Sequence, residues 1–203
     1  TETEKGEVLG VGLWPFALSI VLFSLVIDRI GYGKAMIFAF VCHVASALIT
    51  IFARGYWSLY IGTLIVALAN GTVEAAINPA VATMFPREKT KWLNILHAGW
   101  PGGLVLGGLL TLALGPGADW KWKVALILIP TLIYGAMMLG CRFPVHERVR
   151  AGVPYRDMLR EAGVLGALIV IALMVFEVGR VFAWPAALNI AVIAVLTLGW
   201  GLY

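Results

Sequence analysis

Charged residues are scarce in this sequence. Asp, Glu, Lys and Arg together make up 13% of the 203 residues, whereas 61% are hydrophobic. Soluble globular domains carry about 25% charged residues, and one soluble core cannot bury so much apolar surface. The composition therefore excludes intrinsic disorder, a coiled coil and a nucleic-acid-binding domain as descriptions of the whole chain. It indicates a protein embedded in a lipid bilayer.

Cysteine and histidine are also rare. The chain has two cysteines, Cys42 and Cys141, and three histidines, His43, His97 and His146. Two cysteines in apolar surroundings provide neither a disulfide framework nor the spacing of metal ligands. The histidines are scattered along the sequence rather than converging. We therefore expect no metal, no cofactor and no enzymatic activity.

Long apolar runs occupy most of the sequence. A bilayer core about 30 Å thick is crossed by roughly 20 apolar residues of α-helix. The runs therefore predict an all-α, polytopic transmembrane helix bundle with about seven spans, of which the third is longer than one membrane thickness. The expected spans are residues 7–27, 35–53, 57–85, 93–114, 122–141, 163–181 and 183–203.

The positions of the fifteen lysines and arginines predict how the spans are oriented. Ten of them lie in the connections 28–34, 86–92 and 142–161, and five lie on the opposite side. Because positive charge marks the cytoplasmic side, we expect these connections in the cytoplasm and the N-terminus outside, in a multi-pass protein of the cell (inner) membrane. An outside N-terminus without a start methionine or a signal sequence predicts that at least one upstream span is missing.

Three parts are expected along the chain. Residues 1–142 form one helix bundle, residues 143–162 form a cytoplasmic loop, and residues 163–203 form two further spans. Within the loop, residues 155–161 place apolar side chains on one face of a short helix and charged side chains on the other. This pattern is typical of an interfacial helix, and a solvated linker is the alternative.

Glu74 is an acidic residue near the middle of the third expected span. An exposed charge at that depth costs about 2.5–3.5 kcal/mol to insert. Asn70 and Asn78 lie four residues before and after it, so the three polar groups share one helix face, and Pro79 removes a backbone hydrogen bond beside them. The pattern predicts a carboxyl group that lines a central cavity and changes protonation state during a cycle. A Glu neutralised by a neighbour for structural reasons is the alternative.

The fourth expected span carries a second polar stripe. Asn94, His97 and Pro101 recur on one helix face, with Trp100 beside them. The structural alternatives are a histidine bonded to a neighbouring helix, an interfacial asparagine and a tryptophan that anchors packing. The candidate substrate-binding residues of both stripes are Asn70, Asn78, Asn94, His97 and Trp100.

Glycines mark another face of the same span. Gly99, Gly103 and Gly107 recur at a spacing of four, which allows two helix backbones to approach closely. We expect these three residues to pack against another helix. His43, on an otherwise apolar second span, is also interpreted as a packing residue.

The first cytoplasmic connection resembles a transporter signature. Residues 28–31 read Asp-Arg-Ile-Gly, with Ser24 four residues earlier and Lys34 three residues later. This resembles the motif between the second and third helices of the major facilitator superfamily, although Ser24 replaces a glycine and two basic positions are changed. The resemblance implies a conformational-switch loop, in which the acid caps or approaches the positive end of a neighbouring helix. Its residues are Asp28, Arg29, Gly31 and Lys34.

A second likeness covers the next two expected spans. Residues 73–79, the pair Leu93-Asn94 and the glycine-rich residues 101–103 resemble the fourth and fifth helices of the fucose and glucose/galactose proton symporters. The resemblance implies that Glu74 is the proton-coupling carboxylate, with Asn78 and Asn94 near the sugar path. It covers about residues 7–142, and it implies a partial major-facilitator fold with five of the six helices of the N-terminal half. The two further spans within residues 163–203 are then either the start of the C-terminal half or an inserted pair.

Together these features predict secondary active transport. We expect proton-coupled uptake of a sugar or similar small polar solute by alternating access, with protons, that solute and the lipid bilayer as partners. A proton-coupled drug or nucleoside carrier is the alternative, because residues 99–108 loosely resemble the glycine-proline helix of drug antiporters. A polytopic membrane enzyme or a scaffold is a weaker alternative.

Overall fold

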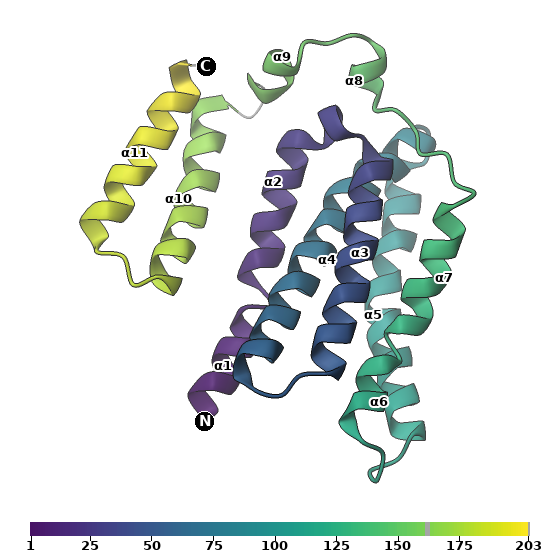
Figure 1. The fold of residues 1–203 in the computed structure, drawn as a ribbon. Coiled ribbons are helices and arrows are strands. Elements are labelled where there is room, and N and C mark those ends of the chain that lie inside the picture. The colour runs from purple at the N-terminus through teal and green to yellow at the C-terminus, as the bar shows by residue number, and fades with distance from the viewer. Residues whose placement is uncertain (161–162, 203) are drawn as a thin grey trace. The chain divides into compact units, whose positions relative to one another are not determined.

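The computed structural model describes residues 1–160 and 163–202, and the regular elements of these residues are all helices (Figure 1). The chain forms two compact units, Thr1–His146 and Glu147–Tyr203. The helices of the first unit are α1 (Glu2–Gly10), α2 (Trp14–Ile30), α3 (Tyr32–Ile51), α4 (Tyr56–Met84), α5 (Lys89–Ala113), α6 (Trp120–Ala125) and α7 (Leu128–Met138). Those of the second are α8 (Glu147–Arg150), α9 (Tyr155–Arg160), α10 (Gly163–Val181) and α11 (Ala186–Leu202).

The described residues contain six helical segments that are long and apolar enough to cross a membrane. They confirm the predicted all-α membrane bundle and match the first six expected spans. The seventh expected span corresponds to α11, which has 17 residues and is shorter than the other six. The six segments are Glu2–Ile30, Tyr32–Ile51, Tyr56–Met84, Lys89–Ala113, Trp120–Met138 and Gly163–Val181.

Two of these segments are interrupted, which the hydropathy pattern did not predict. The first is divided into α1 and α2 at Val11–Leu13, between Gly10 and Pro15. The fifth is divided into α6 and α7 just before Pro130. A proline lacks the N–H that would bond to the carbonyl four residues earlier, so each break lies one turn before a proline. Helix α4, by contrast, contains Pro79 without a break. Its whole length is 29 residues, or about 43 Å.

Small residues hold α4 against α2 and α3. Ala69 and Ala76 of α4 and Ala39 of α3 are fully buried. At the crossing with α2, a Cβ placed on Gly71 would collide with the Phe16 carbonyl and lie 2.7 Å from Ser19 Cβ. Within a membrane, side chains this small let helix backbones approach closely enough to gain dispersion contacts.

The core of the first unit lies near the link between α2 and α3. Ile27, Tyr32 and Met36 pack there with Ala76 and Ala80 of α4. The partly buried residues around them come from α2, α4, α7 and the segment that follows α7; they are Phe23, Ile30, Val73, Ile77, Tyr134, Met138 and Phe143. This cluster holds the part of α4 that runs from Val73 to Ala80 and includes Glu74.

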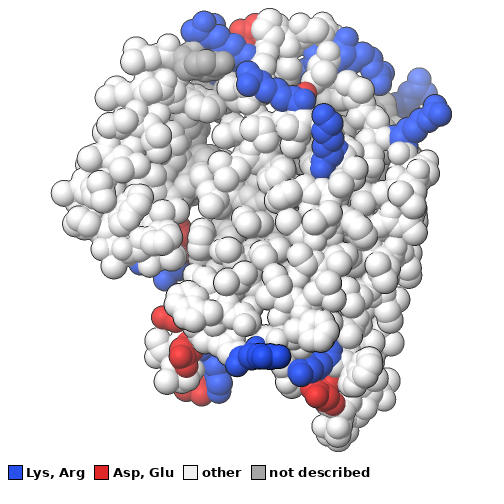
Figure 2. Space-filling model, in the orientation of Figure 1, with Lys and Arg blue, Asp and Glu red and all other residues white. Residues whose placement is uncertain are grey.

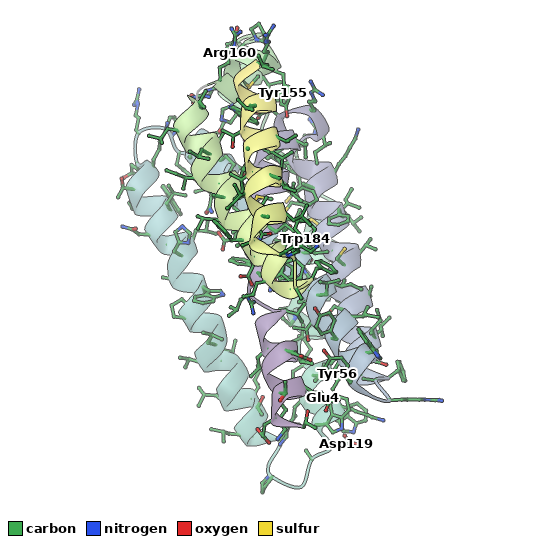
Figure 3. All side chains as sticks on the ribbon, turned by 90° about the vertical axis from the view of Figure 1, so that its left-hand side faces the viewer. Glu4, Tyr56, Asp119, Tyr155, Arg160 and Trp184 are labelled. Atoms are coloured by element: carbon green, nitrogen blue, oxygen red, sulfur yellow. The ribbon has the colours of Figure 1, made fainter. Side chains whose placement is uncertain are left out.

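The two ends of the first unit differ in charge (Figure 2). Basic residues gather at the end with the α2–α3 link, whereas acidic and basic residues are mixed at the other end, where Glu4, Tyr56 and Asp119 lie (Figure 3). This pattern agrees with the predicted cytoplasmic position of the basic end, which stays a prediction. The basic residues are Arg29, Lys34, Arg87, Lys89, Lys91 and Arg142.

The second unit contains a helical hairpin. Asn189 of α11 is buried against Gly179 of α10, where a Cβ on the glycine would overlap the Asn189 side chain. Trp184 lies at the turn of this hairpin, away from Arg160 (Figure 3). Arg180 donates two hydrogen bonds to Glu177 one turn earlier on α10.

The predicted short helix of the loop is present as α9. Its Tyr155, Met158 and Leu159 are partly buried, whereas Arg156, Asp157 and Arg160 are exposed, so the helix has the predicted two faces. The last residues of the predicted loop, Glu161 and Ala162, lie outside the described residues. That the helix lies on the membrane surface stays a prediction, as do the domain boundaries at 142 and 162.

Candidate functional site

The polar residues of α4 line one face of the helix, as expected from their spacing. Asn78 Nδ2 donates a hydrogen bond of 2.8 Å to Glu74 Oε2. Both side chains are partly buried, and Asn70, one turn before Glu74, is exposed. The Oδ1 atom of Asn78 is buried and has no hydrogen-bond partner in the described part of the chain. The face therefore combines a carboxyl group with amide groups that retain hydrogen-bonding capacity.

No cation pairs with the Glu74 carboxyl group among residues 1–160 and 163–202. The ion pairs found there lie at exposed positions such as Glu88–Lys91 and Glu177–Arg180. The Glu74 carboxyl group accepts one hydrogen bond in the structure, from the amide N–H of Asn78. Within this described part of the chain no Lys, Arg or His contacts the carboxylate, so it gives no support to a basic neighbour that neutralises Glu74 for structural reasons.

Asn70 is tied to two other helices through a histidine. His43 Nε2 of α3 lies 2.9 Å from Asn70 Oδ1, and His43 Nδ1 lies 2.7 Å from the hydroxyl oxygen of Tyr134 on α7. The rings of His43 and Tyr134 meet edge to face, with centroids 5.8 Å apart. The three side chains therefore form a continuous hydrogen-bonded chain from α7 through α3 to the polar face of α4.

A second polar contact secures α4 from the side of α2. The Ser19 hydroxyl donates to the Leu68 carbonyl at 2.7 Å and lies 3.1 Å from Thr72 Oγ1. Thr72 also donates to the Leu68 carbonyl at 2.8 Å. Ser19 and Thr72 are almost completely buried, so these bonds fix the rotation of α4 and thereby the direction in which its polar face points.

No hydrogen bond among the described residues joins the polar residues of α5 to the polar face of α4. Asn94, His97 and Trp100 are exposed, and Trp100 retains 75% of its accessible surface. In the described residues no hydrogen bond joins Asn94 or His97 to α4. Helix α5 has no buried residue at all. Their role in substrate binding stays a prediction.

The glycine face of α5 has no packing partner in the described part of the chain. A Cβ placed on Gly99, Gly103 or Gly107 would meet nothing within 4 Å. The close helix packing expected from their spacing is therefore not made by α1–α4, α6 or α7. It stays a prediction that concerns a neighbour outside the first unit.

The predicted switch loop is a one-residue link between α2 and α3. Gly31 forms that link with φ +79° and ψ 151°, a conformation that requires glycine. Asp28 is partly buried near the end of α2, whereas Arg29 and Lys34 are exposed. Asp28 does not cap α3, because α3 begins without a side-chain capping bond. The structure thus explains the glycine of the motif and leaves the switching role as a prediction.

The sequence did not predict the roles of two residues in the hydrogen-bonded chain. His43 was assigned to packing, and Tyr134 was not singled out in its apolar span. A histidine and a tyrosine in otherwise apolar spans were the available signals, because buried polar groups need hydrogen-bond partners. What the sequence does not contain is the pairing itself, since Tyr134 lies 91 residues from His43.

No metal centre accompanies these residues. The described residues contain no group of three or more His, Cys, Asp or Glu side chains that could hold a metal ion. What the polar face of α4 itself provides is hydrogen bonding and one carboxyl group that can exchange a proton.

Comparison with known proteins identifies the family. The family model described as Major Facilitator Superfamily matches residues 1–203, the whole chain. Searches of curated proteins and of solved structures gave no match. Members of this family are membrane transporters rather than enzymes, and they move small solutes across a lipid bilayer. With its membrane-spanning helices, its polar helix face and a match along its full length, this chain belongs to the major facilitator superfamily.

Proposed function

We propose that this transporter takes up a sugar or a similar small polar solute together with protons, by alternating access. The observation that carries the proposal is the Glu74 carboxyl group in the middle of α4, bonded to Asn78 and unpaired with any cation of the described residues. An intramembrane acid in this setting is a candidate for a proton site. Loading it with a proton removes the charge that would otherwise cross the membrane interior.

The amide groups beside Glu74 suit a polyhydroxylated solute. Asn70 and Asn78 offer both donors and acceptors without net charge, which is what a neutral sugar hydroxyl requires. Asn70 is exposed on the polar face, so a solute can reach it. Asn94, His97 and Trp100 would contribute from α5 when the two helices face a common cavity.

Replacing Glu74 by Gln tests the proton role directly. Glu74→Gln retains the size and the hydrogen-bonding capacity of the side chain but cannot gain or lose a proton at neutral pH. In membrane vesicles with the full-length transporter, we expect accumulation of labelled D-glucose or D-galactose against its gradient to be abolished. Exchange of labelled for unlabelled sugar should persist in part, because exchange does not require net proton movement.

Glu88→Gln is the matched control for this experiment. Glu88 is exposed between α4 and α5 and pairs with Lys91 at 3.1 Å, so the same chemical change there should leave uptake intact. Unchanged uphill uptake in Glu74→Gln would contradict the proposed proton site. Export of a drug or nucleoside driven by inward proton flow, without sugar uptake, would replace sugar symport by the alternative carrier function.

A further inference from the structure

His43 joins three helices at the level of the polar face. Its ring bonds to Asn70 on α4 and to Tyr134 on α7, at 2.9 Å and 2.7 Å. The side chain is partly buried, whereas Asn70 at the end of the chain is exposed. The histidine thus links a supporting tyrosine in the helix bundle to an amide that a solute can touch.

The chemistry of the three groups fixes which atom donates. Asn70 Oδ1 can only accept a hydrogen bond, so Nε2 of His43 must carry the hydrogen. In the neutral ring Nδ1 is then the acceptor, and the Tyr134 hydroxyl donates to it. As a result the oxygen of Asn70 already accepts one hydrogen bond, which sets the direction of the amide, and its two N–H groups remain available on the exposed face.

The helices that His43 connects are held together without it. Ala39 and Ala47 of α3 are buried, and the Ser46 hydroxyl of α3 donates to the Gly62 carbonyl of α4 at 2.7 Å. Between α3 and α7, the Phe40 ring fills the space beside Gly135, where a Cβ would collide with it. Packing therefore accounts for the helix positions, and the two hydrogen bonds of His43 are left to orient Asn70.

We propose that His43, supported by Tyr134, is a positioning residue that turns the Asn70 amide so that its N–H groups face the solute. The transporter then selects a solute that presents a hydrogen-bond acceptor, such as a hydroxyl oxygen, at this point of the path. The inference rests on the proposed function, because it takes the polar face of α4 as part of the solute path.

The tautomer of His43 can be measured without any solute. In full-length protein labelled with ¹⁵N-histidine and reconstituted in liposomes, protonated and unprotonated imidazole nitrogens give separate resonances. We expect the Nε2–H form for His43, and we expect Asn70→Ala and Tyr134→Phe to change the His43 signals while those of His97 and His146 stay the same. An Nδ1–H form, or signals indifferent to both variants, would overturn the proposal even if sugar uptake is confirmed.

The effect on selectivity is measured with uptake of D-glucose, D-galactose and their monodeoxy derivatives. Loss of one solute hydrogen bond weakens binding about tenfold, so in the wild type one deoxy position should raise KM by about that factor. In His43→Phe the KM for the parent sugar should rise about tenfold, and the penalty for that deoxy derivative should disappear. The maximal rate should change little, because the exposed amide acts in binding.

His43→Gln provides the conservative variant. A glutamine amide can still donate to Asn70, so it should restore much of the selectivity that His43→Phe loses. Both variants could instead lose maximal rate and membrane-inserted protein to the same extent. That result would show that His43 is needed only for folding, and it would overturn the proposal. If the wild type takes up no sugar while the His43 signals behave as expected, the solute class fails and the positioning of Asn70 stands.

Discussion

Helices α4 and α5 both carry a stripe of polar residues next to an internal proline, Pro79 and Pro101. In α4 the stripe is supported from behind by buried alanines, by Gly71 and by the Ser19 and Thr72 hydroxyls of the α2 crossing. In α5 the polar residues, the glycines and most of the apolar residues are exposed within the first unit.

The difference shows what support adds to a polar stripe. Helix α4 is held by hydrogen bonds from α2 and from His43 of α3, and Tyr134 of α7 supports that histidine. The donors and acceptors of the stripe therefore point in fixed directions. The α5 residues have the same chemistry without that support in the described residues. The side chains of a binding site are ordered by the residues that pack behind them. In the described part of the first unit, α4 has such residues and α5 does not.

The largest effect on stability should come from filling the close contact between α2 and α4. Gly71→Ala places a methyl group against the Phe16 carbonyl and the Ser19 side chain, neither of which can move without shifting α2. Overpacking of this kind costs about 1–3 kcal/mol, and contact with backbone places this site toward the upper limit. We expect a clearly lower melting temperature of the full-length protein in detergent. An unchanged melting temperature would mean that α2 and α4 lie further apart than in this structure.

A smaller effect is expected from removing one buried hydroxyl. Ser19→Ala deletes the bond to the Leu68 carbonyl, but that carbonyl still accepts from Thr72. Because no buried group loses its last partner, the free energy of unfolding should fall by only about 1 kcal/mol. Ser24→Ala, at an exposed position of the same helix, is the control and should change stability by less than about 0.5 kcal/mol. Equal losses in both variants would show that the buried Ser19 hydroxyl at the α2–α4 crossing stabilises the protein no more than an exposed serine does.

The smallest effect, and one of opposite sign, is expected in α5. Gly103→Ala meets no atom within 4 Å and replaces a poor helix former by the best one, so it should stabilise the protein by up to about 1 kcal/mol. The measurement is the same thermal unfolding. A loss of stability instead would show that another helix packs on the glycine face of α5. The small residues of α5 would then be in close helix contact, as those of α4 are.

Much of the fold follows from local sequence patterns. The apolar runs predicted every long helix, and the 29-residue length of α4 agreed with the expected third span. The breaks before α2 and α7 were not predicted, although Pro15 and Pro130 mark both. Pro79 shows why proline alone is a poor guide, because α4 continues through it. Whether a helix breaks at a proline depends on the contacts around it, and α4 is held by its neighbours.

The sequence by itself determined the bilayer as the solvent, the helices that cross it and the alignment of Asn70, Glu74 and Asn78 on one face. These properties depend on composition and on the 3.6-residue period of one helix, which are local. Only the tertiary structure decided that His43 reaches Asn70 and Tyr134, which lie 27 and 91 residues away, and that the described residues of the first unit leave α5 exposed. The reason is physical: a hydrogen bond between helices depends on their rotation and separation, which the packing of small residues such as Gly71 and Ala76 sets.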